Sequence, residues 1–236
     1  MIKGFELKEE SGSVFLQLLH LRGIKHAFGT REEREGMAAA FGFSSQQLLT
    51  LRQVHGAEVL VVKENPDTLP HPLPYDAAIT RREGVALGVW TADCVPILMV
   101  DQSKGVIGAV HAGWRGLRHG IVERTISKMG ESFRSPPGDI LVGIGPGIGP
   151  CCYEVGKDVV NLFQSSRDDG HLFIQEREGR SFLDLGFASR LQLSKAGVAP
   201  ENIEAIPLCT ACREDLFFSY RRDGKTGRQL SFIMLG

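Results

Sequence analysis

Short apolar runs recur along this 236-residue chain, and they predict strands more often than helices. Several runs are apolar at every position, as in the Ile-Leu-Met-Val stretch at residues 97–100. Unbroken apolarity over so few residues is typical of strands that are covered on both faces. We predict strands at residues 58–62, 77–80, 85–90, 96–100, 106–110, 140–144, 203–208 and 230–235.

Amphipathic helices are fewer. We predict them at residues 120–129, 158–164 and 185–196. In the first, Ile121, Val122 and Ile126 fall on one face, and Gly130 is expected to end the helix. Asp184 is the expected N-cap of the third. Runs of strands with interspersed helices indicate an α+β architecture rather than a regular alternation of strands and helices.

The length fits one large domain or two small ones. The segment 65–74 contains four prolines and is expected to be an extended surface loop rather than a domain boundary. We therefore predict a single domain over residues 1–236.

Composition narrows the class of protein. Lys plus Arg (27) nearly balances Asp plus Glu (28), so there is no long-range attraction to nucleic acid or an anionic membrane. No apolar run approaches the roughly 20 residues of a membrane helix, and the N-terminus does not resemble a secretory signal. Five cysteines are an odd number and a poor disulfide framework. We predict a cytoplasmic protein with no membrane or nucleic-acid partner.

Three candidate metal ligands stand where apolar runs begin or end. His55 precedes a predicted strand, Cys94 lies in a tight connection between two strands, and His111 follows another. Ligands at three strand ends can converge on one rim of a sheet. Two imidazoles and one thiolate leave a fourth tetrahedral position open, which is the pattern of a catalytic zinc site. Taken singly, each residue is more often structural, since a free buried cysteine usually behaves as a small hydrophobe.

Five segments resemble, in order, the motifs of the YfiH-type or laccase-domain family, also called the multifunctional purine nucleoside phosphorylase family. They are RQVHG (52–56), TADCVPIL (91–98), VHAGWRG (110–116), GPGIGPCCYEVG (145–156) and SYRRDGKTGR (219–228). The resemblance implies an α-β-β-α layered sandwich of mixed sheets, with Zn²⁺ bound by His55, Cys94 and His111. It also implies phosphorolysis of adenosine, inosine and guanosine, cleavage of methylthioadenosine, and deamination of adenosine.

Charged residues beside the predicted metal ligands suggest catalytic roles. Asp93 is a candidate proton shuttle, with an orienting or turn carboxylate as the alternative. Arg52 and Arg115 could clamp phosphate bidentately, or they could form salt bridges to Asp76 or Asp93.

Two further residues are candidates for substrate binding. Trp114 could stack on a purine ring, or it could be an ordinary packing residue. Arg221 could reach the pocket or could cap a strand. The expected small-molecule partners are purine nucleosides and phosphate.

The remaining cysteines form a pair of neighbours, Cys151-Cys152, and a Cys-x-x-Cys pair, Cys209 and Cys212. Four thiols could form a structural zinc site. Adjacent cysteines rarely fit tetrahedral geometry as a pair, so the sequence does not favour a second metal there.

Other functions remain open. A metal-independent hydrolase would use Cys94 as nucleophile and His111 or His55 as base, and some family members suggest amide cleavage in peptidoglycan precursors. A copper oxidase, which the family's older name suggests, needs many imidazoles, whereas this chain has seven histidines and no His-x-His pair. A non-catalytic binding protein would have an empty triplet and no turnover.

Overall fold

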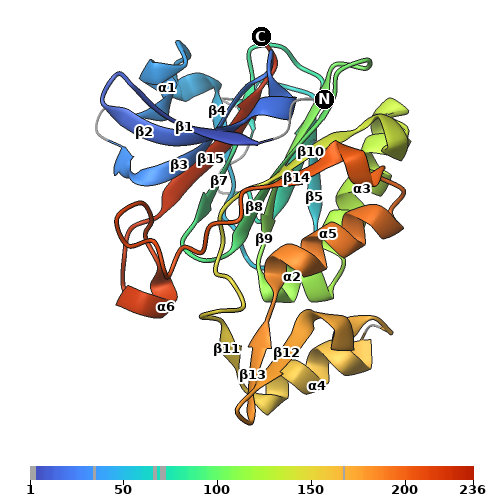
Figure 1. The fold of residues 1–236 in the computed structure, drawn as a ribbon. Coiled ribbons are helices and arrows are strands. Elements are labelled where there is room, and N and C mark those ends of the chain that lie inside the picture. Colours follow the sequence, from blue (N-terminus) through green and yellow to red (C-terminus); the bar gives the residue numbers. More distant parts are fainter. Residues whose placement is uncertain (1–3, 34–35, 66–67, 70–72, 167) are drawn as a thin grey trace.

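Two mixed sheets pack face to face, and a small third sheet lies at one end of the molecule (Figure 1). The computed structural model describes residues 4–236 apart from 34–35, 66–67, 70–72 and 167. About half of the segment expected as a proline-rich loop therefore lies outside the described residues. Among the helices that are described, none has the length and apolarity to cross a membrane.

The first sheet has six strands in the order β1-β2-β3-β15-β7-β4. Their bounds are β1 Phe5–Glu10, β2 Ser13–Leu18, β3 Lys25–Glu33, β15 Gln229–Met234, β7 Ala86–Thr91 and β4 Leu48–Thr50. Neighbours are antiparallel except β4 and β7, which are parallel. The last strand of the chain therefore lies in the middle of this sheet.

The second sheet also has six strands, in the order β14-β10-β8-β9-β6-β5. Their bounds are β14 Ile203–Ala205, β10 Leu141–Ile144, β8 Val95–Asp101, β9 Val106–Ala112, β6 Ala77–Thr80 and β5 Val59–Val62. The two edge pairs are parallel and the inner pairs antiparallel.

Strand β8 is apolar at every position from 95 to 100 because both of its faces are covered. Ile97 and Met99 pack against helices on the outer face, whereas Leu98 and Val100 pack between the two sheets. The helices on that outer face are α2 Trp114–Arg118, α3 Ile121–Phe133 and α5 Leu185–Lys195. On the far side, α1 Met37–Ala40 covers part of the first sheet through Met37. The α-β-β-α sandwich is confirmed, with one thin outer layer.

The third sheet has three antiparallel strands in the order β11-β13-β12. The strands are β11 Glu154–Val155, β13 Arg180–Leu183 and β12 Ile174–Arg177, and α4 Lys157–Ser166 accompanies them (Figure 1). A last short helix, α6 Tyr220–Asp223, precedes β15. Short 3-10 helices occur at Leu19–Leu21, Ser45–Gln47, Pro137–Asp139, Gly170–Phe173 and Pro200–Asn202.

All eight predicted strands are present, and two boundary predictions were wrong. Strand β14 ends at Ala205 rather than at residue 208, because Pro207 has no N–H to continue the ladder. Helix α3 continues through Gly130 to Phe133 and ends at Arg134, which takes the left-handed conformation instead. An interior glycine costs a helix only about 1 kcal/mol.

The buried imidazole of His26 in β3 should make the protein acid-sensitive. Its Nδ1 donates to the Ile24 carbonyl (2.8 Å) and its Nε2 accepts from the Leu18 N–H (3.1 Å), so the ring fits its site only when neutral. Burial lowers the pKa of His26 from 6.5 to about 4. Between these values the unfolded chain binds a proton that the folded chain does not, so stability is lost as the pH falls through this range.

We expect the free energy of unfolding to fall by about 3 kcal/mol between pH 7 and pH 4 through His26 alone. Denaturant unfolding at both pH values measures it. In His26→Gln the difference should shrink by that amount, while an unchanged difference would assign the acid sensitivity to other groups.

Candidate active site

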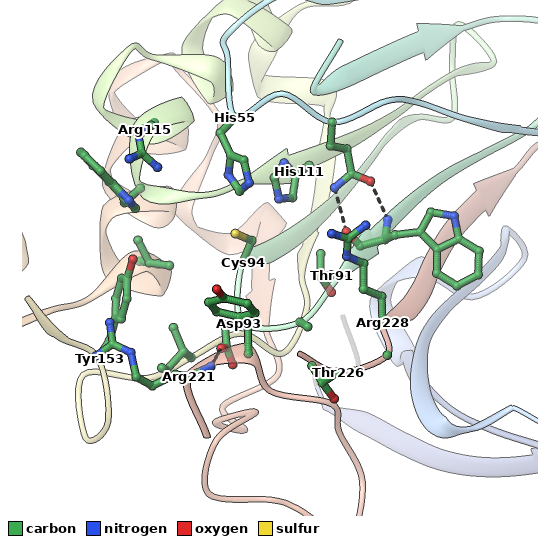
Figure 2. A pocket seen from close by; sticks show the side chains of 18 of the residues that line it. His55, Thr91, Asp93, Cys94, His111, Arg115, Tyr153, Arg221, Thr226 and Arg228 are labelled. Carbon is green, nitrogen blue, oxygen red and sulfur yellow. Dashed lines mark hydrogen bonds between the residues drawn. The ribbon is translucent and has the colours of Figure 1, made fainter. Parts of the chain in front are cut away.

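The three predicted metal ligands meet at one end of the second sheet. His55 comes from the loop between β4 and β5, Cys94 immediately precedes β8, and His111 lies near the end of β9. Strands β8 and β9 pair so that Val95 faces Ala112, which brings Cys94 beside His111. One ligand atom from each residue lies within 4.8 Å of the others. Figure 2 shows the three side chains pointing toward one another.

Asp76 organises this group. Its buried carboxylate accepts hydrogen bonds from the backbone N–H groups of Val54 (3.2 Å), His55 (2.9 Å) and Gly56 (2.7 Å). It also contacts Nδ1 of His111 at 2.8 Å, which leaves Nε2 free to face the cluster. Burial would raise the pKa of Asp76, but the bonds from His111, Gly56 and Val54 lower it below its ordinary value. A carboxylate behind a histidine is a usual support for a metal ligand.

The electrostatics favour a thiolate at Cys94. Burial would raise the pKa of this thiol, but His111 and His55 together lower it to about 6. Burial would lower the pKa of His111, but Cys94 and Asp76 raise it to about 9. A thiolate is therefore held beside a proton-binding imidazole, and a cation at the same place could replace that proton.

The backbone around the ligands is shaped to bring them together. His55 has φ +58° and Asp93 has φ +99°, both in the region that non-glycine residues rarely occupy. Such strain costs about 1–3 kcal/mol per residue and clusters at functional sites. At Gly113 a Cβ would lie 2.9 Å from Nδ1 of His55 and 3.0 Å from Sγ of Cys94, so only glycine leaves this space open.

A cavity of about 650 Å³ opens over the three ligands. All eight residues singled out from the sequence line it: Arg52, His55, Asp93, Cys94, His111, Trp114, Arg115 and Arg221. The structure thus brings together residues that span 170 positions of the chain, from 52 to 221.

Asp93 uses both carboxylate oxygens inside the protein. Oδ1 accepts from Thr210 Oγ1 and Oδ2 accepts from the backbone N–H of Arg221, each at 2.7 Å. These bonds fasten the start of α6 to the loop that carries Cys94. Of the two roles considered for Asp93, the geometry fits the orienting one better.

Arg115 and Trp114 act as a pair. The guanidinium carbon of Arg115 lies 4.3 Å from the centre of the Trp114 ring, a cation–π contact. Trp114 also packs near Phe163, and the centroids of these two rings are 6.3 Å apart. Among the described residues, neither Arg115 nor Arg52 forms an ion pair with Asp76 or Asp93.

Arg221 lines the cavity wall, and it also contacts the first residue of strand β11. Its Nη1 donates to the Glu154 carbonyl (2.7 Å), and its guanidinium lies 4.9 Å from the centre of the Tyr153 ring. Burial, with Cys94 and Asp93 nearby, raises the pKa of Tyr153 to about 12. The phenol is therefore neutral at physiological pH and can donate a hydrogen bond.

The sequence interpretation missed several cavity residues. Tyr153, Lys225 and Arg228 all lie on the wall, and the last two belong to the SYRRDGKTGR segment in which only Arg221 was considered. Arg228 faces the cavity from the side opposite Arg115 (Figure 2). Within the described part of the chain, the wall thus holds five cationic side chains and one carboxylate, Asp93.

Fold and site together define an α-β-β-α sandwich protein with a His-Cys-His cluster at the floor of a cationic cavity. The family model described as multi-copper polyphenol oxidoreductase laccase matches residues 28–236, and the chain belongs to this laccase-domain family. The resemblance found in the sequence motifs is confirmed.

Similar proteins agree with this membership. A purine nucleoside phosphorylase of Clostridium acetobutylicum is 37% identical over 97% of this chain and 94% of its own length. The purine nucleoside phosphorylase YlmD of Geobacillus stearothermophilus is 38% identical over 85% of this chain and 76% of its own. The crystal structure of YlmD has a TM-score of 0.87 at 33% identity, covering 99% of both chains. That of Bacillus licheniformis YfiH has a TM-score of 0.88 at 28% identity, covering 98% of this chain and 99% of that chain.

Proposed function

We propose that this chain is a zinc-dependent purine nucleoside phosphorylase that also deaminates adenosine. The observation that carries the proposal is a cationic cavity built over two imidazoles and one thiolate. Relatives named purine nucleoside phosphorylase, similar over nearly the whole chain, support the phosphorylase activity. Substrates would be adenosine, inosine, guanosine and methylthioadenosine, all handled by residues 1–236 as one catalytic domain. A cytoplasmic location remains a prediction from the sequence.

Zinc suits the donor set. His55, Cys94 and His111 would hold it, since thiolate and neutral imidazole are its ordinary ligands. The bound ion would supply Lewis acidity at the reacting atom and leave one coordination position open. The buried Asp76 behind His111 and the open space above Gly113 both fit an occupied centre.

Side chains of the cavity would bind the phosphate and the nucleoside. In phosphorolysis an oxygen of hydrogen phosphate bonds to C1′ of the ribose and the C1′–N9 bond breaks. The purine leaves with the bonding electrons and takes up the proton that the phosphate loses. Arg52 and Arg115 would hold phosphate, because a guanidinium can donate two parallel hydrogen bonds. Trp114 would position Arg115 through their stacking contact, and Arg221 with the Tyr153 phenol would contact the nucleoside.

Incubation of the zinc-loaded protein with adenosine tests the proposal. With phosphate we expect adenine and ribose 1-phosphate, and with or without phosphate we expect inosine and ammonia. Neither product set appearing would overturn the proposal.

Arg115→Met should separate the two reactions. Loss of a charged hydrogen-bonding partner costs about 1.5–3 kcal/mol, so we expect KM for phosphate to rise at least tenfold. Deamination does not use phosphate and should change little, which makes it an internal control. Arg124→Met removes an exposed arginine on α3 outside the cavity wall and should alter neither reaction. Equal losses in both reactions of Arg115→Met would contradict the phosphate role.

The main alternative is the metal-independent Cys-His amide hydrolase. The Cys94 thiolate beside His111 is the observation that favours it. Chelation decides between them, because the hydrolase would keep its activity and the zinc enzyme would lose it. Multicopper oxidation is less well supported, since the described cluster offers only two imidazoles.

A further inference from the structure

Four cysteines that the proposed reaction does not use meet on the outside of the cavity wall. Cys151 and Cys152 precede β11, and Cys209 and Cys212 precede α6. Their Sγ atoms all lie within 4.8 Å of one another. Sγ of Cys212 is 3.5 Å from that of Cys151 and 3.3 Å from that of Cys152. Four sulfurs around one zinc ion at about 2.3 Å would be separated by roughly 3.8 Å, so the cluster already has the right size.

Adjacent cysteines were not expected to share one site, and the turn that carries them explains why these two can. The N–H groups of Cys152 and Tyr153 both donate to the Gly149 carbonyl (3.0 Å each), which curls the chain tightly at this point. An isolated bridge pairs Gly147 with Cys209 and sets the two loops side by side. Both members of the neighbouring pair therefore lie within reach of Cys212.

The backbone is arranged to support a thiolate at Cys209. The N–H of Gly149 donates to its Sγ at 3.2 Å, and the N–H groups of Ala211 and Cys212 are also directed at this sulfur. Hydrogen bonds to a ligating sulfur are a usual support for a metal ligand. All five cysteines of the chain are free, and Cys94 alone lies outside this cluster.

We propose that Cys151, Cys152, Cys209 and Cys212 bind one zinc ion at a structural site separate from the cavity. Four thiolates fill a tetrahedral shell and leave no open position, which distinguishes this site from the His-Cys-His centre. None of the four lines the cavity, whereas Cys151 and Cys212 are exposed and give the ion access from solvent.

The ion would join two segments that build the cavity wall. Cys152 precedes Tyr153, which lies on that wall. Cys209 precedes Thr210, whose hydroxyl donates to Asp93. Arg222 continues the connection, because its Nη1 donates to the carbonyls of Thr210 (3.0 Å) and Ala211 (3.3 Å). A metal bound by the four sulfurs would hold the loop of Cys151 and Cys152 at a fixed position relative to the loop of Cys209 and Cys212.

Metal counting in three proteins tests this site. Wild type, Cys212→Ser and Cys94→Ser are stripped with a chelator under reducing conditions, reloaded with zinc, desalted and analysed for zinc per chain. We expect Cys212→Ser to hold one zinc fewer than wild type. Cys94→Ser is the matched control, since it makes the same change at the other site and should keep the four-cysteine ion. This result does not depend on which reaction the cavity catalyses.

X-ray absorption at the zinc edge keeps the test decisive if Cys212→Ser fails to fold. The four-cysteine cluster is intact in Cys94→Ser, and we expect its retained zinc to show a shell of four sulfurs at about 2.3 Å. A shell dominated by nitrogen, or no retained zinc, would overturn the proposal. Equal zinc content in folded Cys212→Ser and wild type would overturn it as well.

Discussion

Replacing Cys94 with alanine should remove the metal from the His55–His111 site and abolish turnover, while the fold is retained. The change deletes the only anionic ligand of the cluster, and two imidazoles cannot replace it. Loss of a mere supporting partner of a ligand typically costs 10–100-fold in affinity or activity, so we expect the loss of a ligand to exceed 100-fold. Zinc analysis, nucleoside turnover and thermal unfolding measure the three parts of this expectation.

Chelated wild type is the matched control for Cys94→Ala. Both proteins lack the metal of the His55–His111 site, so both should be inactive. Bound metal should also protect the Cys94 thiolate of the loaded wild type from alkylation. Wild-type turnover in Cys94→Ala would refute the site assignment. Full activity in chelated wild type, with none in the variant, would instead identify Cys94 as the nucleophile of a hydrolase.

The second sheet could be predicted from sequence because its strands are buried on both faces. β8 and β9 are covered by helices on one side and by the first sheet on the other, so their positions are apolar apart from the buried Asp101 and His111. A run of apolar residues does not mark the strand at the start of the chain. In β1 five of six residues are exposed, and its alternation of Leu with Lys and Glu shows no core-facing run. Such an edge strand is fixed by pairing with β2, not by its own burial.

The meeting of Cys94 with His111 could also be predicted, because a short hairpin joins their strands. Asp76 was considered only as a salt-bridge partner of Arg52 or Arg115, although an acidic residue directly before the apolar strand at residues 77–80 was a visible signal of a further role. Its role depends on a loop, 54–56, that returns to the same point from another part of the chain. That return is a tertiary contact, and no local pattern encodes it.

The four-cysteine cluster is a second case in which tertiary contacts decide what local sequence could not predict. Residue spacing argued against it, since adjacent cysteines diverge in an extended chain. The tight turn at Gly149 and the bridge between Gly147 and Cys209 reverse that conclusion. The bridge joins segments about 60 residues apart, and it depends on how the sheets place the two loops.

Replacing Asp76 with asparagine should weaken metal binding and destabilise the fold at once. The amide can offer one acceptor oxygen, so its NH₂ group must face a backbone N–H of Val54, His55 or Gly56. His111 also loses the carboxylate that holds its ring. We expect zinc affinity to fall 10–100-fold. Breaking a buried charged network should lower the free energy of unfolding by about 3 kcal/mol.

Asp101→Ala separates these two effects, because alanine cannot accept the hydrogen bonds that Oδ1 of Asp101 accepts. Asp101 is equally buried and accepts hydrogen bonds from Ser103 Oγ (2.8 Å) and the Lys104 N–H (3.0 Å), but it lies at the opposite end of β8 from Cys94. Its replacement should destabilise the protein and leave zinc affinity unchanged. Competition with a chromophoric chelator measures affinity, and denaturant unfolding of the metal-free proteins measures stability. If both variants lost zinc affinity equally, the loss would reflect general destabilisation, and Asp76 would have no specific role behind His111.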